Sequence, residues 1–327
     1  MEHKDVVIVG SGASGLACAR RLTEAGMTCV VLDRGRRPGG RASSRVLADG
    51  RLLDLGVPLF RMSDARTRDF MGRWLEAGFV VPFPGRVADV TDGHMTLRDS
   101  DEDPRWTGSP SMGALLEAMA IDLPVRQEAT VTRAFRAENH WVLQGPEDAE
   151  VPLEVHASAL VLAMPLPQAR RVVSDLPAPT DGNDACLVAA FDAIPEAMPG
   201  GSASPATLAC YLHGDDLLAL VIRRPGRPVV VHASAAWSLP RLERSPANWA
   251  AEMAEALAAR FGGPVPKTVH AHRWTFARPL GPLGGGCGWD PDRRLAVCGD
   301  AWIGPAGRFE GAMLSGLEAA DRLLRQD

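Results

Sequence analysis

The fold of this chain is decided by the stretch Val6-Val7-Ile8-Val9-Gly10-Ser11-Gly12-Ala13-Ser14-Gly15. Its first four residues form the apolar run that is typical of a parallel strand buried on both faces. Three glycines follow in the spacing GxGxxG, where the first permits a tight turn, the second lets backbone approach a pyrophosphate, and the third lets a helix pack on the strand. The stretch therefore predicts a strand, a phosphate-binding turn and a helix.

The residues that follow support a dinucleotide site. A helix is expected over 13–25, ended by Gly26, and a second buried strand over 28–33. Asp33 ends that strand 18 residues after Gly15, close to the ~20 expected for a carboxylate that binds ribose hydroxyls. An unrelated glycine-rich turn is the alternative that this context disfavours. Cofactor contacts are predicted at Gly10, Gly12, Ala13, Gly15, Asp33 and Arg34.

Three further features favour FAD over NAD as the cofactor. The stretch Pro38-Gly39-Gly40-Arg41 can hold a loop and a positive charge against the phosphates. Gly299-Asp300 ends a late apolar strand, where a carboxylate can bind a polyol such as the ribityl chain. Glu310-Gly311-Ala312 opens the last helix, whose N-terminus would stabilise negative charge on a reduced flavin. Taken singly, these features also fit a surface turn, a loop aspartate and close helix packing.

The domain organisation follows from length and pattern. A chain of 327 residues suggests about two domains. The stretch over 184–276 is rich in short strands and holds one helix, in which Trp249, Met253, Leu257 and Phe261 recur every four residues. The predicted fold class is α/β, with a Rossmann-like FAD-binding domain and an inserted β-rich substrate domain. The FAD-binding domain is assigned to residues 1–75, 104–165 and 284–327, and the substrate domain to 76–103 and 166–283.

Composition argues against several classes of protein. The net charge of −5 disfavours a nucleic-acid surface. No apolar run reaches the ~20 residues that span a bilayer, and the start lacks the features of a signal peptide, so a cytoplasmic protein that binds no membrane is expected. The six cysteines have no metal-ligand spacing and are expected to be reduced and buried. His270 and His272 share a strand face without a third ligand nearby, so no metal site is predicted.

The chain resembles the flavin amine oxidase superfamily, and within it the bacterial renalase-like branch. The first 41 residues carry the superfamily resemblance. The renalase-like segments are Val231-His232-Ala233-Ser234, Ala271-His272-Arg273-Trp274-Thr275-Phe276-Ala277, Gly299-Asp300-Ala301-Trp302 and Glu310-Gly311-Ala312. Two features depart from the family pattern. Val221-Ile222-Arg223-Arg224 is shorter and less polar than usual, and Phe276 stands where Tyr is common.

The resemblance implies site residues and chemistry. Gly40, Arg41, Asp300 and Ala312 would contact FAD, Val131 would lie near the adenine by its backbone, and the segment Asp54–Phe60, with Gly56 and Val57, would pass beside the flavin ring. Gly299, Glu310 and Gly311 are counted with them. Renalase-like enzymes oxidise 2- or 6-dihydro isomers of NAD(P)H and return NAD(P)⁺ and hydrogen peroxide. The expected partners are therefore a small-molecule substrate and molecular oxygen.

Residues for the substrate side are predicted with the alternatives open. The chemistry needs a ring held flat at near-attack distance, so no catalytic residue is assigned, and Phe60, His232, Trp274 and Trp302 are taken as pocket residues. Each is equally explained as a core residue. Arg223, Arg224 and Arg227 could bind substrate phosphates, although arginines on loops are usually solvated.

Two other functions remain alternatives. Neither lysine, Lys4 or Lys267, falls in a segment assigned to the flavin, which disfavours the first alternative, an amine oxidase. No cysteine matches the attachment site for covalent flavin, so FAD is expected to be non-covalent. A non-catalytic FAD-binding protein is the second alternative.

Overall fold

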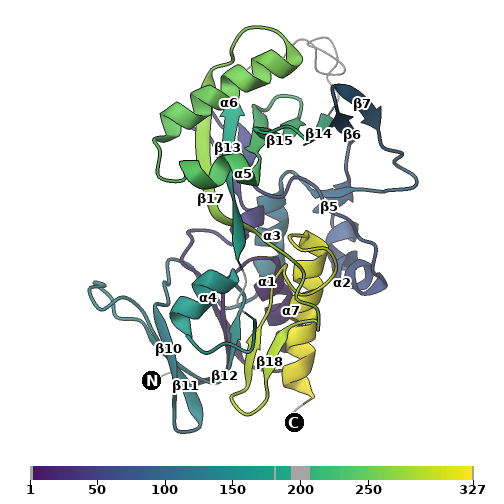
Figure 1. The fold of residues 1–327 in the computed structure, drawn as a ribbon. Helices are drawn as coiled ribbons and strands as arrows, with labels where there is room; N and C mark the ends of the chain where they lie inside the picture. Colours follow the sequence, from purple (N-terminus) through teal and green to yellow (C-terminus); the bar gives the residue numbers. More distant parts are fainter. Residues whose placement is uncertain (1–2, 180–181, 193–206, 326–327) are drawn as a thin grey trace.

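The structure is a computed structural model that describes residues 3–179, 182–192 and 207–325. Two large sheets organise it, one above the other in Figure 1. The first has eight strands in the order β10-β11-β12-β1-β2-β9, with β19 beside β12 and β18 beside β19. Its strands are β1 (His3–Val9), β2 (Cys29–Leu32), β9 (Val125–Arg126), β10 (Arg133–Ala137), β11 (His140–Gln144), β12 (Glu154–Leu162), β18 (Gly288–Asp290) and β19 (Leu295–Val297).

Helices cover both faces of this sheet. The strands β19, β12, β1, β2 and β9 run parallel, and alternate residues of β1 face opposite cores. Val6 and Ile8 pack with α1 (Ala13–Glu24), α3 (Met112–Ala120) and α7 (Phe309–Leu324), whereas Val7 and Val9 pack on the side of α4 (Leu166–Val172). Burial on both faces explains the continuous apolar run of β1, and this is a Rossmann-like α/β arrangement.

The second sheet has seven strands in the order β17-β13-β16-β15-β14-β6-β7. All neighbours are antiparallel except β14 and β6. Helix α6 (Pro246–Phe261) covers its outer face, where the predicted period-four residues Trp249, Met253, Leu257 and Phe261 are all buried. Its strands are β6 (Gly85–Thr91), β7 (His94–Leu97), β13 (Asn183–Phe191), β14 (Thr207–His213), β15 (Leu218–Arg223), β16 (Val229–Ala233) and β17 (Thr268–Pro279).

Short elements connect the two sheets. The hairpin β3–β4 packs Leu53 against the inner face of the second sheet, the face turned away from α6. The remaining elements are β3 (Ser44–Val46), β4 (Leu52–Asp54), α2 (Ala65–Glu76), β5 (Val80–Pro82), β8 (Trp106–Gly108), α5 (Ala235–Ser238) and the 3₁₀ turns Gly40–Ala42 and Leu239–Arg241. Within the described residues, no helix is both long and apolar enough to span a bilayer.

The predicted fold class is confirmed, and individual bounds differ from expectation. The helix expected over 13–25 spans Ala13–Glu24, and the strand expected over 28–33 spans Cys29–Leu32. β12 begins at Glu154, and its residues His156 and Ala157 pair antiparallel with β11 and parallel with β1. β6 and β7, which fall in the 76–103 piece, join the second sheet. The assignment of residue ranges to two functional domains stays a prediction.

Candidate functional site

The glycine turn between β1 and α1 forms one side of the site. Gly10 has a φ of +112°, and a Cβ at Gly15 would lie 1.9 Å from the carbonyl oxygen of Gly10, so both positions require glycine. A Cβ at Gly12 would meet nothing within 4 Å. Gly12 is also the N-cap of α1, which has no side-chain cap and no acidic residue in its first turn. The free N–H groups of Ala13 and its neighbours are therefore available to an anion.

Asp33 ties the end of β2 to this turn. Its Oδ2 accepts from the backbone N–H of Ser11 at 2.6 Å and from its hydroxyl at 2.8 Å, and its Oδ1 accepts from the N–H of Gly35 at 2.6 Å. The carboxylate thus lies beside the phosphate-binding turn, as a ribose ligand would require. Its contact with a ribose stays a prediction.

The paired glycines of the next loop pack on the same turn. Gly39 donates its N–H to the carbonyl of Ser11 at 2.9 Å. Gly40 has a φ of +52°, and a Cβ there would lie 3.5 Å from Cα of Gly12. The 38–41 loop therefore lies over the glycine turn, and the side chain of Arg41 extends from it.

Arg41 and Asp300 form a two-point ion pair. Nη2 of Arg41 lies 2.7 Å from Oδ1 of Asp300, and Nη1 lies 2.8 Å from Oδ2. The same guanidinium donates to the carbonyl of Ala277 in β17 at 3.0 Å. The side chains are 26% and 13% exposed, so the pair is partly open to a ligand. The two residues were predicted as separate FAD contacts, and the structure brings them together.

Helix α7 presents a second helix N-terminus. Its N-cap, Arg308, makes no side-chain cap hydrogen bond. Glu310 accepts from the backbone N–H of Asp64 at 2.8 Å and so holds the start of α2. A Cβ at Gly311 would lie 2.2 Å from the carbonyl oxygen of Ile303, so this glycine serves close packing. Ala312 is buried one turn into the helix.

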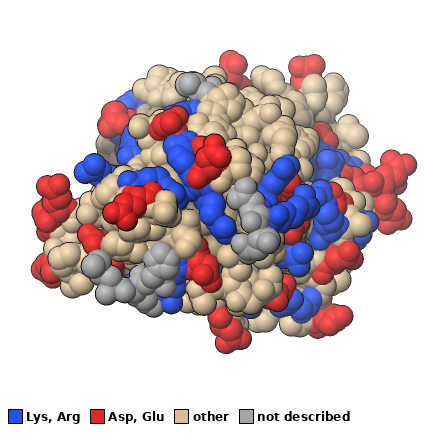
Figure 2. Space-filling model, turned by 90° about the horizontal axis from the view of Figure 1, so that it is seen from below, with Lys and Arg blue, Asp and Glu red and all other residues tan. Residues whose placement is uncertain are grey.

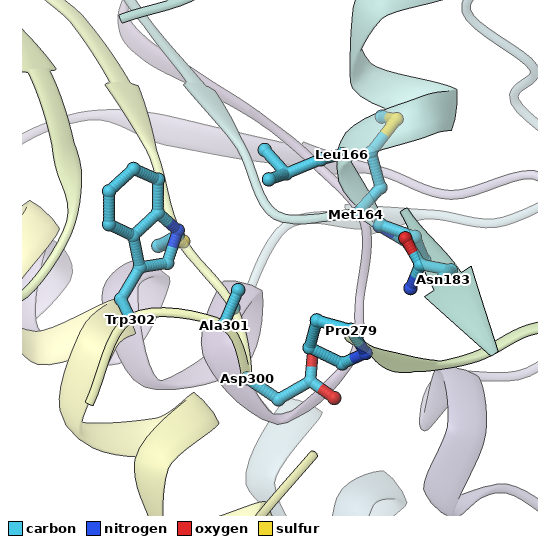
Figure 3. A pocket seen from close by; sticks show the side chains of 10 residues that line it. Met164, Leu166, Asn183, Pro279, Asp300, Ala301 and Trp302 are labelled. Atoms are coloured by element: carbon cyan, nitrogen blue, oxygen red, sulfur yellow. The ribbon is translucent and has the colours of Figure 1, made fainter. Parts of the chain in front are cut away.

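A pocket opens beside Asp300, at the carboxyl ends of the parallel strands (Figure 3). Its cavity volume is about 10 Å³, which is room for about one water molecule. Its lining comes from the ends of β12 and β17, the start of β13 and the loop after β19, and consists of Met164, Pro165, Leu166, Asn183, Pro279, Cys298, Gly299, Asp300, Ala301 and Trp302. Ligands of open α/β sheets bind at such strand ends.

These features fit a dinucleotide. Two helices have N-termini without a side-chain cap, Gly12 leaves open space before one of them, and the partly exposed Arg41–Asp300 pair joins the 38–41 loop to the loop after β19. If FAD is bound, the glycine turn would hold its pyrophosphate and Asp300 its ribityl chain.

The remaining predicted cofactor residues are Gly56, Val57, Val131 and Arg34. A Cβ at Gly56 would come within 1.8 Å of the carbonyl oxygen of Arg41, and Val57 donates its N–H to the same oxygen at 3.2 Å. Val131 is buried before β10, and Arg34 lies 3.1 Å from the side-chain amide of Gln168. No observation tests their contact with FAD.

The four predicted pocket residues lie in three clusters. Phe60 is buried against Phe309, with ring centroids 4.7 Å apart. Trp302 is buried in the core on the α4 side and lines the pocket of Figure 3. His232 and Trp274 lie on the inner face of the second sheet. That all four serve one substrate pocket stays a prediction.

Three histidines form a row on this inner face. His232 of β16 and His272 of β17 both pair with Val188 of β13, which lies between them. His270, His272 and Trp274 occupy every second position of β17 and so share one face. The ring centroids of His272 and Trp274 are 4.2 Å apart. Nε2 of each histidine in this row is buried without a hydrogen-bond partner. The i, i+2 spacing was visible in the sequence, but the neighbour across β13 was not.

The row is uncharged at neutral pH. Burial, followed by the neighbouring His272, lowers the pKa of His232 to about 4. Burial, His270 and Arg45 lower the pKa of His272 to about 4, and burial and Arg45 lower that of His270. Burial is the largest cause for all three histidines, and the charge of Arg45 acts on His270 and His272. Among the described residues, no group of three or more His, Cys, Asp or Glu side chains is placed to hold a metal ion.

Arg223, which ends β15, and Arg224, which follows it, are buried or nearly so. The expectation that arginines in this stretch are solvated is therefore corrected. Arg223 is 2% exposed. Arg224 donates to Oδ2 of Asp54 at 2.7 Å, and Nη1 of Arg227 lies 3.5 Å from the same oxygen. A carboxylate and backbone carbonyls therefore bind the guanidinium groups of Arg224 and Arg227, and the suggested role of these arginines in binding substrate phosphates stays a prediction.

Comparisons with known proteins agree with this geometry at the level of fold. Residues 8–74 match the family model of the NAD(P)-binding Rossmann-like domain. The chain is 47% identical to putrescine oxidase from Kocuria rosea over 54 residues, which are 16% of this chain and 11% of that protein. It is 27% identical to beta-cyclopiazonate dehydrogenase from Aspergillus flavus over 172 residues, 49% of this chain and 37% of that one. The chain thus spans far less than two thirds of either relative.

A solved structure covers the whole chain. Putrescine oxidase bound to putrescine superposes with a TM-score of 0.66 at 15% identity, over 99% of each chain. At this identity the likeness shows the fold alone. The second sheet, which the family model does not reach, is therefore part of the shared architecture.

Proposed function

We propose that this chain binds FAD non-covalently and oxidises a small reduced substrate, a 2- or 6-dihydro isomer of NAD(P)H, to NAD(P)⁺. The paired Arg41 and Asp300, next to the open glycine turn, support the cofactor assignment. The 47% identity to putrescine oxidase over 54 residues supports it independently. FAD, when bound, would supply a two-electron acceptor that molecular oxygen reoxidises with release of hydrogen peroxide.

The histidine row carries the substrate assignment. Its imidazoles are neutral near pH 7 and the charge of Arg45 acts on two of them, so the row favours a neutral ring over a protonated amine. A dihydropyridine is neutral and planar and carries a carboxamide, which neutral imidazole and indole groups suit. Trp274 places this row beside the segment predicted to pass the flavin ring, because its indole Nε1 donates to the carbonyl of Leu55 at 3.0 Å.

The chain's own residues then have a modest task. Loss of hydride leaves an aromatic pyridinium, so no carbon-bound proton has to be removed and no general base is required. The apolar cluster of Leu53, Leu55, Val188 and Leu220 would exclude water from the inner face. Orientation at near-attack distance is the main contribution expected of the protein.

Oxidation of an amine is the second candidate. The similarity to putrescine oxidase over 54 residues favours it. The lysines add no support. Lys267 directly precedes β17, and its backbone carbonyl accepts from the N–H of Asp192, outside the segment predicted to pass the flavin ring. The charge of Arg45, which lowers the pKa of His270 and His272, opposes this candidate.

Anaerobic stopped-flow mixing distinguishes these reactions. The FAD-loaded protein would be mixed with chemically misreduced NAD(P)H, with normal NADPH, and with a panel of amines that includes putrescine. We expect fast flavin bleaching by the isomers alone and peroxide on admission of oxygen. Bleaching by amines and not by isomers would establish the second candidate, and bleaching by none of them would leave a different substrate or a non-catalytic flavoprotein.

A pair of variants tests whether the histidine row contributes to this reaction. His272→Gln should slow bleaching by the isomers about tenfold or more, since it disturbs the ring that contacts Trp274. His94→Gln, at an exposed position of the same sheet, is the matched control and should leave the rate unchanged.

A further inference from the structure

The irregular segment Leu55–Pro58 is held from the second sheet at both of its ends. The carbonyl of Leu55 accepts from Nε1 of Trp274 at 3.0 Å, and the carbonyl of Pro58 accepts from Nη2 of Arg224 at 2.7 Å. Trp274 belongs to β17 and Arg224 directly follows β15. Side chains at two strands of the second sheet therefore hold the four-residue segment that follows β4.

Arg224 is the more heavily engaged of the two side chains. Besides Pro58, it donates to Oδ2 of Asp54 at 2.7 Å and to the hydroxyl of Thr107 at 3.0 Å. Its side chain is 11% exposed and that of Asp54 is 5% exposed. Hydrogen bonds of this charge-assisted kind are strong where water is excluded. Arg224 thus brackets the segment, holding the residue before it and the last residue within it.

The opposite side of the segment is equally confined. A Cβ at Gly56 would lie 1.8 Å from the carbonyl oxygen of Arg41 and 3.5 Å from Cζ2 of Trp274. Val57 donates its N–H to that same carbonyl of Arg41. Arg41 in turn pairs with Asp300. A shift of the segment would therefore displace Arg41, which is predicted to bind FAD.

We infer that Arg224 is a positioning residue, which with Trp274 clamps the segment Leu55–Pro58 against Arg41 and so sets the place of the flavin ring. This role rests on the proposed function, because it concerns the bound cofactor. Arg224 touches neither Asp300 nor the glycine turn in any described contact, so it acts through the backbone of the segment. Its loss should alter the environment of the ring more than the hold on the pyrophosphate.

The first arm of the test needs no cofactor. Hydrogen–deuterium exchange is measured on the full chain without FAD for wild type, Arg224→Met and Arg98→Met. The control removes a comparable two-point ion pair, since Arg98 binds Asp89 at 2.7 Å through two nitrogens elsewhere in the second sheet. We expect backbone amides between Leu55 and Phe60 to exchange about tenfold faster in Arg224→Met and to stay unchanged in the control.

The second arm uses the FAD-loaded protein. Arg224→Met should change the visible absorption and circular dichroism of the flavin and slow its maximal bleaching about tenfold, while the Kd for FAD changes less than about threefold. Arg224→Lys keeps the charge and should restore part of both signals. If Arg224→Met folds poorly, Arg224→Lys and Asp54→Asn provide the same comparison.

The outcomes separate this inference from the proposed function. If exchange, flavin spectrum and bleaching in Arg224→Met all match those of Arg98→Met, the positioning role is wrong and Arg224 only joins the two sheets. If wild type takes up no FAD, the proposed function is wrong and the flavin-positioning role falls with it. The exchange arm then still decides whether the clamp exists.

Discussion

At the scale of single residues, the Arg41–Asp300 pair has the greatest consequence. Two parallel hydrogen bonds fix both side chains between the N-terminal loop and the loop after β19. Such pairs combine strength with defined geometry. A carboxylate fixed in this way can still accept a hydroxyl, because each oxygen has more than one lone pair.

Substitution at Asp300 should weaken FAD binding. Asp300→Ala removes a charge-assisted acceptor worth roughly 1.5–3 kcal/mol, which corresponds to about a 10- to 100-fold higher Kd for FAD. Fluorescence titration measures this effect. The control is Asp290→Ala, which breaks the ion pair between Asp290 of β18 and Arg293 and should leave the Kd for FAD unchanged.

A double-mutant cycle shows whether Asp300 touches the cofactor itself. If Asp300 acts on FAD directly, Asp300→Ala should still raise the Kd in an Arg41→Met background. If it serves only to hold Arg41, the second substitution should have no further effect.

At the scale of elements, the histidine row links β16 and β17 to acid stability. An unfolded histidine titrates near pH 6.5, whereas the pKa of His232 and His272 in the folded chain is lowered to about 4. Between these values the unfolded chain binds protons that the folded chain does not. The free energy of unfolding should therefore fall as the pH drops from about 6.5 to 4, by up to ~1.4 kcal/mol per pH unit for each histidine.

Urea unfolding at pH 7 and pH 5 checks this dependence. His272→Gln should flatten it, and His94→Gln, at an exposed position, should not. An equal loss of stability in wild type and His272→Gln over this range would show that other groups control acid stability.

The contact between α1 and α7 gives a second prediction at this scale. A Cβ at Gly316 would lie 2.0 Å from the carbonyl oxygen of Ser14, so Gly316→Ala must push the two helices apart. We expect a loss of about 1–3 kcal/mol in the free energy of unfolding, measured by urea denaturation.

A matched glycine provides the control for that contact. Gly72 lies within α2, and a Cβ there meets nothing within 4 Å. Gly72→Ala should stabilise the chain by about 0.5–1 kcal/mol, because alanine favours the helix. Loss of stability in both variants would mean that Gly316 is not special to the helix contact.

At the scale of the whole molecule, the candidate site joins both ends of the chain. The glycine turn, Arg41 and Asp300 are distant in sequence, so a ligand that contacts all of them should stabilise the folded chain as a unit. FAD at 100 times its Kd should add about 2.7 kcal/mol and raise Tm by several degrees. Riboflavin, which lacks the pyrophosphate, should have a much smaller effect in the same thermal scan. A shift with NAD and none with FAD would contradict the cofactor assignment.

The charge distribution agrees with a small-molecule role rather than a nucleic-acid one. Figure 2 shows Lys and Arg interspersed with Asp and Glu on the face seen there. Many arginines of the described residues are paired with carboxylates, such as Arg21 with Asp321 and Arg293 with Asp290. Paired charges of this kind do not form the continuous basic surface that phosphate backbones need.

The sequence by itself determined the local units. The run Val6–Val9, the glycine spacing and Asp33 predict β1, the turn, α1 and β2, because these contacts close within about 30 residues and depend on backbone geometry and apolar period. The apolar residues that recur every four positions predict α6 for the same reason. Residue types also suggested Arg41 and Asp300 as polar groups of one site, each by its place at the end of a strand or in a loop.

Only the tertiary structure decided which of these groups meet. Arg41 and Asp300 are 259 residues apart, Arg224 and Asp54 are 170 apart, and His232 neighbours His272 only through the register of β13. Local spacing carries no information on such partners, since they depend on strand order and on how one sheet packs against a hairpin. For that reason Arg224, which sequence reasoning placed in solvent or on phosphates, instead donates to Asp54 and to the carbonyl of Pro58.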